Sequence, residues 1–191
     1  IAAAYFRGRA GIPVTVFEKS SRLGGVPMQV IPGFRISEAA IEKDIALMQF
    51  YGAEIRLNTP APSVAELNVA GYTHIFFAVG AGKAGRLNIP GNVVPVIQWL
   101  RDLKAGKKVS LGHVAVIGGG NTAMDAARAA IRSGAASATL VYRRTKRYMP
   151  ADAEELELAM ADGVRFLELA APVAQENGRL KCERMTLGAP D

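Results

Sequence analysis

The amino-acid sequence predicts an α/β fold built from two successive β-α-β units, the first of them incomplete. In the second half of the chain, a β-branched run at residues 113–117 stops at three glycines, and an alanine-rich segment then extends to Gly134. A second apolar run follows at residues 138–142. Near the N-terminus, a helical segment at residues 1–9 precedes a short apolar run at residues 14–17, which matches the second half of such a unit.

The turn after residues 113–117 has the pattern G-x-G-x-x-A, with Gly118, Gly120 and Ala123 at its key positions. The first glycine permits a sharp exit from the strand, the second lets a pyrophosphate approach the backbone, and the alanine keeps the helix close to the sheet. The helix N-terminus presents free N–H groups and a positive dipole end. The sequence therefore predicts a Rossmann-like dinucleotide-binding turn, made of Gly118, Gly119, Gly120, Asn121, Thr122 and Ala123.

The residues after the second apolar run favour NADP over NAD. NAD sites place an Asp or Glu about 20 residues beyond the glycine turn, where it accepts hydrogen bonds from the ribose. Here that position holds Tyr142, Arg143 and Arg144, followed by Lys146 and Arg147, with no acid. Guanidinium groups bind a 2′-phosphate through bidentate, charge-assisted hydrogen bonds. The alternative is a solvated loop, or one that binds an acidic partner surface.

Composition and charge limit the classes of partner. Half of the 191 residues are hydrophobic and 21% are charged, which is ordinary for a globular protein with a buried core. The net charge is +6, but residues 101–147 alone contain ten Lys or Arg against two acids. The positive charge therefore belongs to the dinucleotide half. The basic residues have no interleaved aromatic residues, so we do not expect a nucleic-acid partner.

Cysteine use and hydropathy exclude further classes. Cys182 is the one cysteine, which excludes an internal disulfide and a C-x-x-C redox or zinc pair, and no metal site is predicted. The longest uncharged run, residues 109–124, contains the glycine turn and is a poor membrane span. No signal peptide is recognisable. We therefore expect a cytoplasmic protein that does not bind a membrane.

In the first half, Gly11 ends the initial helix and Glu18 follows the apolar run at residues 14–17. Glu18 has the place of a ribose-binding acid, or it is a surface acid at a strand end. Its position shortly before Arg22-Leu23-Gly24-Gly25 favours the binding role. Pro27 and Pro32 predict an irregular segment rather than a helix.

Capping residues and periodicity predict the other elements. Ser37 begins a helix that extends to about Tyr51. An apolar strand at residues 73–79 runs into Gly80-Ala81-Gly82 and brings backbone close to a ligand or a neighbouring loop. Further elements are a strand at 53–58, at most a short helix at 64–68, helices at 94–104 and from Asp152 to Gly163, strands at 164–169 and 180–187, and a loop at 172–178. Ile89-Pro90-Gly91 marks a boundary between domains at 1–91 and 92–191.

Five stretches carry a family resemblance: FEKSSRLGG, VIPGFRI, HIFFAVGAG, VIGGGNTAMDAARAAIRSGA and VYRRTKRYMP. With them, most of the chain closely resembles the small subunit of bacterial glutamate synthase and its relatives, a family that includes the NADPH and FAD modules of dihydropyrimidine dehydrogenase. The implied fold is a Rossmann-like NAD(P)-binding domain attached to an incomplete FAD-binding Rossmann-like domain. The implied function is an electron-input module, in which hydride passes from NADPH to FAD and electrons pass onward to iron–sulfur clusters in partner domains.

The resemblance also implies roles for individual residues. Arg143 and Arg144 would bind the 2′-phosphate of NADPH, and Glu18 would bind the adenosine ribose of FAD. The other implied FAD contacts are Lys19, Arg22, Leu23, Gly24, Gly25, Arg35, Val79, Gly80 and Ala81. No catalytic acid or base is predicted, because the cofactors carry the hydride chemistry.

The sequence departs from the family pattern in three ways. The first FAD strand with its glycine turn, the closing FAD segment and the cluster-binding cysteines are not found. We therefore expect a piece of a larger oxidoreductase, with weak or no FAD binding and no turnover alone. Its partners would be iron–sulfur or catalytic domains or subunits, and a homo-oligomer is also open because an incomplete domain exposes apolar surface.

Two other functions stay open at this point. A thioredoxin reductase-like enzyme would need a C-x-x-C pair, which this sequence lacks. A nucleotide-binding regulatory or scaffold module would keep the dinucleotide turn and transfer no electrons.

Overall fold

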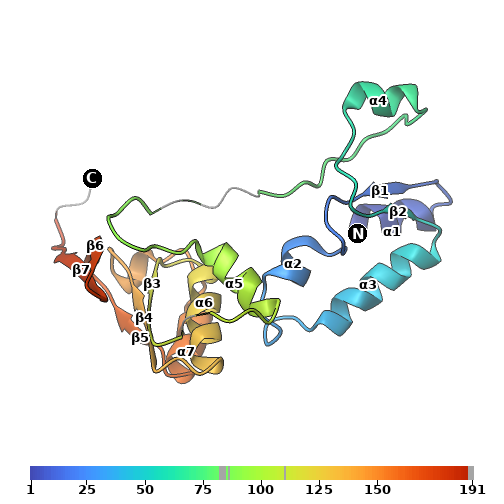
Figure 1. Cartoon of the computed structure of the whole chain (residues 1–191). Coiled ribbons are helices and arrows are strands. Elements are labelled where there is room, and N and C mark those ends of the chain that lie inside the picture. Colours follow the sequence, from blue (N-terminus) through green and yellow to red (C-terminus); the bar gives the residue numbers. More distant parts are fainter. Residues whose placement is uncertain (82–84, 86, 110, 189–191) are drawn as a thin grey trace. The chain divides into compact units, whose positions relative to one another are not determined.

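The computed structural model describes residues 1–81, 85, 87–109 and 111–188, and Gly82 of the predicted strand end lies outside them. The chain divides into two compact units, Ile1–Lys83 and Ala84–Asp191. Each unit pairs parallel strands and packs helices against them, as the α/β prediction requires (Figure 1). The domain boundary predicted at Gly91 lies in the second unit and stays a prediction.

The first unit has a two-stranded parallel sheet, in which β1 (Thr15–Phe17) pairs with β2 (Glu54–Arg56). Its core joins α1 (Ala2–Arg9) to α3 (Glu38–Phe50) through buried Ala4, Leu23 and Met48. The predicted N-cap of α3 is confirmed, because Ser37 Oγ accepts a hydrogen bond from the Ala40 N–H at 3.3 Å. The short helix α4 (Val64–Val69) begins with a capping box between Ser63 and Glu66.

Two expectations for the first unit were wrong. A short helix, α2 (Gly25–Gln29), lies where prolines predicted an irregular segment, because Pro27 falls in its first turn, where no N–H is needed. The segment at residues 73–79 is not a strand, and Phe76 and Val79 are 76% and 77% exposed. A strand needs a neighbour to pair with, and no described residue pairs with this segment.

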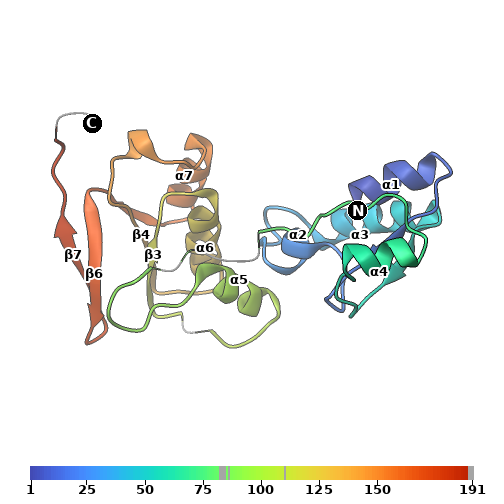
Figure 2. The ribbon, with the colours of Figure 1, turned by 90° about the horizontal axis from the view of Figure 1, so that it is seen from above.

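The second unit is built on a parallel sheet in the order β3 (His113–Ile117), β4 (Ser137–Val141) and β5 (Arg165–Leu167). In its register, Ile117 lies opposite Val141. Helix α6 (Asn121–Arg132) connects β3 to β4 and packs against both strands. It lies between α5 (Val96–Lys104) and α7 (Ala153–Ala161), as both views show (Figures 1 and 2).

The hairpin of β6 (Ala170–Glu176) and β7 (Arg179–Arg184) replaces the loop predicted at residues 172–178. Asn177 and Gly178 have φ of 49° and 73°. Two positive φ angles in a two-residue loop match the twist of a tight β-hairpin, and Asn-Gly is the usual sequence for it. The dipeptide was therefore a hairpin signal that the loop prediction did not use.

An ion cluster joins α6 to α7 in the second unit. Arg128 Nε and Arg132 Nε each donate to Asp162 Oδ2 at 2.8 Å, and Arg132 also reaches Oδ1 at 2.8 Å. Arg128 is 6% exposed and also lies near Glu155, with 3.7 Å between Nη1 and Oε2. Hydrogen bonding from Arg132 and then Arg128 lowers the pKa of Asp162 from 3.8 to about 2.

Across the described residues, each helix is too short or too polar to cross a lipid bilayer.

The Asp162 cluster should make the stability of the second unit depend on pH. Because the pKa of Asp162 is lowered to about 2, its stabilising effect is complete above about pH 4 and is lost as the pH falls towards 2. Asp162→Asn should lower the free energy of unfolding at pH 7 by about 1–3 kcal/mol and flatten its pH dependence in that acidic range. Urea denaturation at several pH values measures both effects.

Glu157→Gln is the matched control, because Glu157 is exposed on α7, the helix for which Asp162 is the C-cap. It should leave the unfolding curve unchanged. Equal stability of Asp162→Asn and the unsubstituted chain at pH 7 would contradict the role of this cluster.

Candidate dinucleotide-binding site

The predicted glycine turn lies at the carboxyl end of β3. Gly118 has φ of 142°, which side-chain-bearing residues rarely adopt, and a Cβ placed there would lie 3.4 Å from the Cβ of Ala123. The Gly118 N–H donates to the Val141 carbonyl at 3.1 Å. The chain thus turns sharply out of the sheet, and the first turn of α6 packs closely on it. This geometry agrees with the predicted roles of the motif, in which Gly118 permits the sharp exit from the strand and Ala123 keeps the helix close to the sheet.

The N-terminus of α6 is open to a ligand. Gly120 is its N-cap, and its carbonyl accepts hydrogen bonds from the N–H groups of Ala123 and Met124. Within the described part of the chain, the N–H groups of residues 119–122 have no acceptor. A Cβ built at Gly120 would meet only Pro150, at 3.9 Å. Unpaired N–H groups at the positive end of a helix fit an anionic group such as a pyrophosphate.

A glycine is needed at position 119 because of a packing contact that the sequence analysis did not predict. A Cβ at this position would lie 2.7 Å from the ring of Tyr142. Gly119 is buried, and its carbonyl accepts a hydrogen bond from the Ala151 N–H at 3.0 Å. The middle glycine therefore makes room for an aromatic side chain from the neighbouring strand end.

The predicted phosphate-binding arginines lie beside this turn in the sheet. They belong to the segment of residues 143–147 that follows β4, here called the arginine loop, and the last two of these residues begin the short 3-10 helix η1 (Lys146–Tyr148). Strand β4 is the parallel neighbour of β3. The Arg143 and Arg144 side chains are exposed, and neither forms an ion pair with another described residue. The loop backbone is nevertheless held, because the Leu169 N–H donates to the Arg144 carbonyl at 3.2 Å and the Lys146 N–H donates to Glu168 Oε2 at 2.8 Å.

In the first unit, Glu18 lies directly after β1 at the carboxyl end of the strand. Its side chain is half-buried, and Oε1 accepts a hydrogen bond from the Ser20 N–H at 2.8 Å. The adjacent Lys19 is exposed. A carboxylate held at a strand end suits hydrogen bonds from ribose hydroxyls, and the FAD role of both residues stays a prediction.

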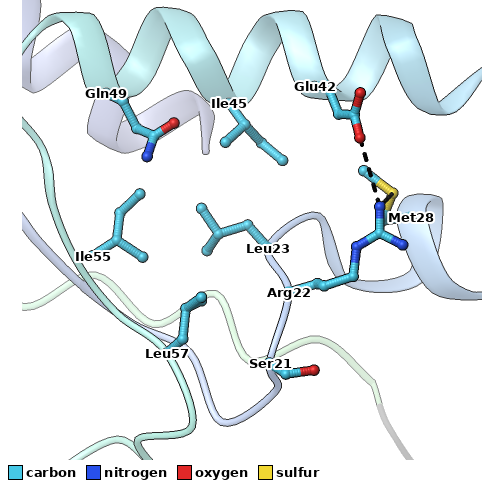
Figure 3. A pocket seen from close by; sticks show the side chains of 9 residues that line it. All are labelled: Ser21, Arg22, Leu23, Met28, Glu42, Ile45, Gln49, Ile55 and Leu57. Atoms are coloured by element: carbon cyan, nitrogen blue, oxygen red, sulfur yellow. Dashed lines mark hydrogen bonds and ion pairs between the residues drawn. The ribbon is translucent and has the colours of Figure 1, made fainter.

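Arg22 is engaged within the first unit. Its Nη2 atom lies 3.2 Å from Glu38 and 3.6 Å from Glu42, both on α3, and 3.5 Å from Met28 Sδ. Figure 3 shows the guanidinium beside Met28, with Glu42 above it, at one side of a hollow. The volume of this hollow is about 430 Å³. The wall of this hollow is mostly apolar and includes Leu23, Ile45, Ile55 and Leu57. Arg22 therefore balances acids of α3, a contact that the sequence analysis did not foresee.

The other predicted FAD residues are spread over the first unit. Gly24 and Gly25 have φ of 99° and 54° and form the turn into α2, and a Cβ at Gly24 would lie 2.6 Å from Met28. Arg35 is exposed in the segment between α2 and α3. Val79, Gly80 and Ala81 are exposed outside any helix or strand, and no hydrogen bond joins them to another described residue. Their roles towards FAD stay predictions.

Gly119→Ala should destabilise the second unit, because the new methyl group meets the Tyr142 ring. We expect a loss of about 1–3 kcal/mol in the free energy of unfolding, and most of this loss should disappear in a Tyr142→Ala background. Gly112→Ala is the control, since a Cβ there meets nothing within 4 Å. Urea denaturation measures these free energies. If Gly119→Ala lowers the free energy of unfolding equally with and without the Tyr142 ring, this packing is ruled out.

Solved structures support the fold. FprA from Mycobacterium tuberculosis in complex with NADPH superposes with a TM-score of 0.70 at 18% identity, over 96% of this chain and 64% of that one. Thioredoxin reductase from T. acidophilum gives a TM-score of 0.63 at 14% identity, over 96% of this chain and 69% of that one. At these identities the likeness concerns the fold alone, and it confirms the Rossmann-type α/β prediction.

Curated relatives match at higher identity. YgfK of Escherichia coli (strain K12), a putative oxidoreductase by name, is 40% identical over the whole chain, which spans 19% of that protein. The NADP(+)-dependent formate dehydrogenase subunit beta of Moorella thermoacetica is 36% identical over the whole of this chain, which spans 29% of that subunit. The glutamate synthase [NADPH] small chain of Azospirillum brasilense is 32% identical over 90% of this chain and 40% of its own length.

The chain thus spans less than half of the length of each of these relatives, and the predicted resemblance to the glutamate synthase small chain is confirmed. The pyridine nucleotide-disulphide oxidoreductase family matches residues 1–187. Because this match covers nearly the whole chain, and because the second unit has the glycine turn of a dinucleotide-binding fold, the chain belongs to the pyridine nucleotide-disulphide oxidoreductase family.

Proposed function

We propose that the chain is the NADPH-binding part of an electron-input module in a larger NADPH-dependent flavin oxidoreductase. The observation that carries this proposal is the pairing of two phosphate-binding features at neighbouring strand ends. The turn after β3 offers N–H groups without acceptors among the described residues, and the loop after β4 offers the exposed Arg143 and Arg144. A dinucleotide with one pyrophosphate and one 2′-phosphate has anionic groups for both features.

The choice of NADPH over NADH rests on charge. An acid at the end of the second strand would repel a 2′-phosphate, whereas the arginine loop carries four cations among its five residues. Because Arg143 and Arg144 form no ion pair with another described residue, binding a phosphate breaks no existing ion pair of theirs. The names of the formate dehydrogenase and glutamate synthase relatives also specify NADP(+) or NADPH.

The first unit would contribute to an FAD site in the larger protein. Glu18 at the end of β1 fits a ribose-binding carboxylate, whereas Arg22 is already paired with Glu38 and Glu42. The chemistry that the cofactors would supply is hydride transfer from NADPH to FAD and electron transfer onward to iron–sulfur clusters in partner domains. The residues of this chain would bind and orient the dinucleotide. Iron–sulfur partners and a cytoplasmic location are likewise part of the proposal.

Removing both arginines should weaken the binding of NADPH selectively. We expect Arg143→Ala/Arg144→Ala to lose about 1–3 kcal/mol of binding free energy for NADPH and little for NADH, because NADH lacks the 2′-phosphate. The loss should shrink at high salt, since exposed charges are screened. Calorimetric titration of the chain with each nucleotide, at two salt concentrations, measures these differences.

A matched control removes the same charge elsewhere in the second unit. Arg179 and Lys181 are exposed on β7, and Arg179→Ala/Lys181→Ala should leave both affinities unchanged. Equal affinity of the unsubstituted chain for NADPH and NADH would refute the assignment to NADP. Failure to bind either nucleotide would refute the glycine turn as a binding site in this chain.

A further inference from the structure

Tyr142 is the first residue after β4 and is held on both sides by backbone hydrogen bonds. Its N–H donates to the Leu167 carbonyl at 2.9 Å, and its carbonyl accepts from the Ala170 N–H at 3.1 Å. The residue is only 9% exposed. These hydrogen bonds fix the backbone of Tyr142 next to the last residue of β5 and the first residue of β6. Its side chain therefore projects from a rigid position.

The side chain of Tyr142 contacts the glycine turn and the residue that directly follows the arginine loop. Its ring packs over Gly119, where a Cβ would already lie too close to the ring atoms. Its hydroxyl donates a hydrogen bond to the Tyr148 carbonyl at 2.7 Å. Tyr148 comes directly after the arginine loop, so one side chain links the glycine turn to the far end of that loop.

Other contacts join the residues after the arginine loop to the same turn. The Ala151 N–H donates to the Gly119 carbonyl at 3.0 Å, and the Asp152 N–H donates to Asn121 Oδ1 at 3.2 Å. Among the described residues, the Tyr142 hydroxyl is the donor that reaches the Tyr148 carbonyl. The Tyr148 side chain is 57% exposed, and the Arg147 guanidinium carbon lies 6.0 Å from the centre of its ring. Backbone hydrogen bonds also hold this end, because the Tyr148 N–H donates to the Thr145 carbonyl at 3.0 Å. The hydroxyl is therefore a side-chain link between the glycine turn and the end of a loop whose cationic side chains are exposed.

We infer that Tyr142 is a positioning residue that sets the selectivity of the site for a nucleotide with a 2′-phosphate. This inference rests on the proposed NADPH-binding function. A loop held in its binding conformation loses less conformational entropy when the ligand arrives, so the same guanidinium contacts give tighter binding. Tyr142 holds the arginine loop at a fixed place relative to the pyrophosphate-binding turn. Its hydroxyl should matter for the 2′-phosphate and little for the rest of the dinucleotide.

Tyr142→Phe tests this inference, because it keeps the ring over Gly119 and removes only the hydroxyl. Calorimetric titration with NADP⁺ and NAD⁺ should show a Kd for NADP⁺ that rises about five- to tenfold, the effect of one lost hydrogen bond. The Kd for NAD⁺ should change by less than about twofold. Tyr148→Phe is the matched control, since it also removes one tyrosine hydroxyl and leaves the accepting carbonyl in place. It should not change the ratio of the two Kd values.

The outcomes separate this inference from the proposed function. If the unsubstituted chain prefers NADP⁺ and Tyr142→Phe keeps the full preference, the positioning role is overturned and the NADP assignment stands. If Tyr142→Phe raises the Kd values for both nucleotides by the same factor, the hydroxyl supports the turn as a whole, and the selectivity role is again overturned. Equal affinity of the unsubstituted chain for both nucleotides overturns the inference together with the NADP assignment. A selective loss for NADP⁺ supports it.

Discussion

The parallel pairing of β3 with β4 is the constraint on which the candidate site depends. Because Ile117 lies opposite Val141, the residues that follow the two strands leave the sheet at the same edge. The Gly118 N–H extends the pairing by one more hydrogen bond, to the Val141 carbonyl. The glycine turn and the arginine loop are distant in sequence, and this register makes them neighbours. A shift of one residue would separate the Tyr142 ring from the space left by Gly119.

Helix α6 brings its N-terminal N–H groups to this edge, and its composition explains how it can lie so close to the sheet. Residues 123–130 of the helix are all buried, and five of them are alanines at 7% exposure or less. Small side chains let the helix approach both strands, so its N-terminal N–H groups stand at the strand ends. The ion cluster around Asp162 then ties the far end of α6 to α7.

Prediction from the sequence succeeded best where local pattern and tertiary contacts agree. The glycine turn, the N-cap at Ser37 and the succession of strand, turn, helix and strand from β3 to β4 follow from local sequence patterns, and the structure has all three. The strand predicted at residues 73–79 was wrong because no described residue pairs with this segment, and an apolar sequence pattern does not by itself form a strand. The role of Tyr142 was missed because its contacts with Gly119 and the Tyr148 carbonyl depend on strand register and loop conformation.

In the proposed site, the ends of β3 and β4 would bind the two kinds of phosphate in NADP⁺ at once. Phosphorus NMR tests it directly, because the 2′-phosphate and the pyrophosphate of NADP⁺ give separate signals. On titration with the chain, both signals should shift, and the pKa of the bound 2′-phosphate should fall below its free value of about 6, because nearby guanidinium groups favour the dianion. A shift of the pyrophosphate signal alone, with the 2′-phosphate pKa unchanged, would contradict the account.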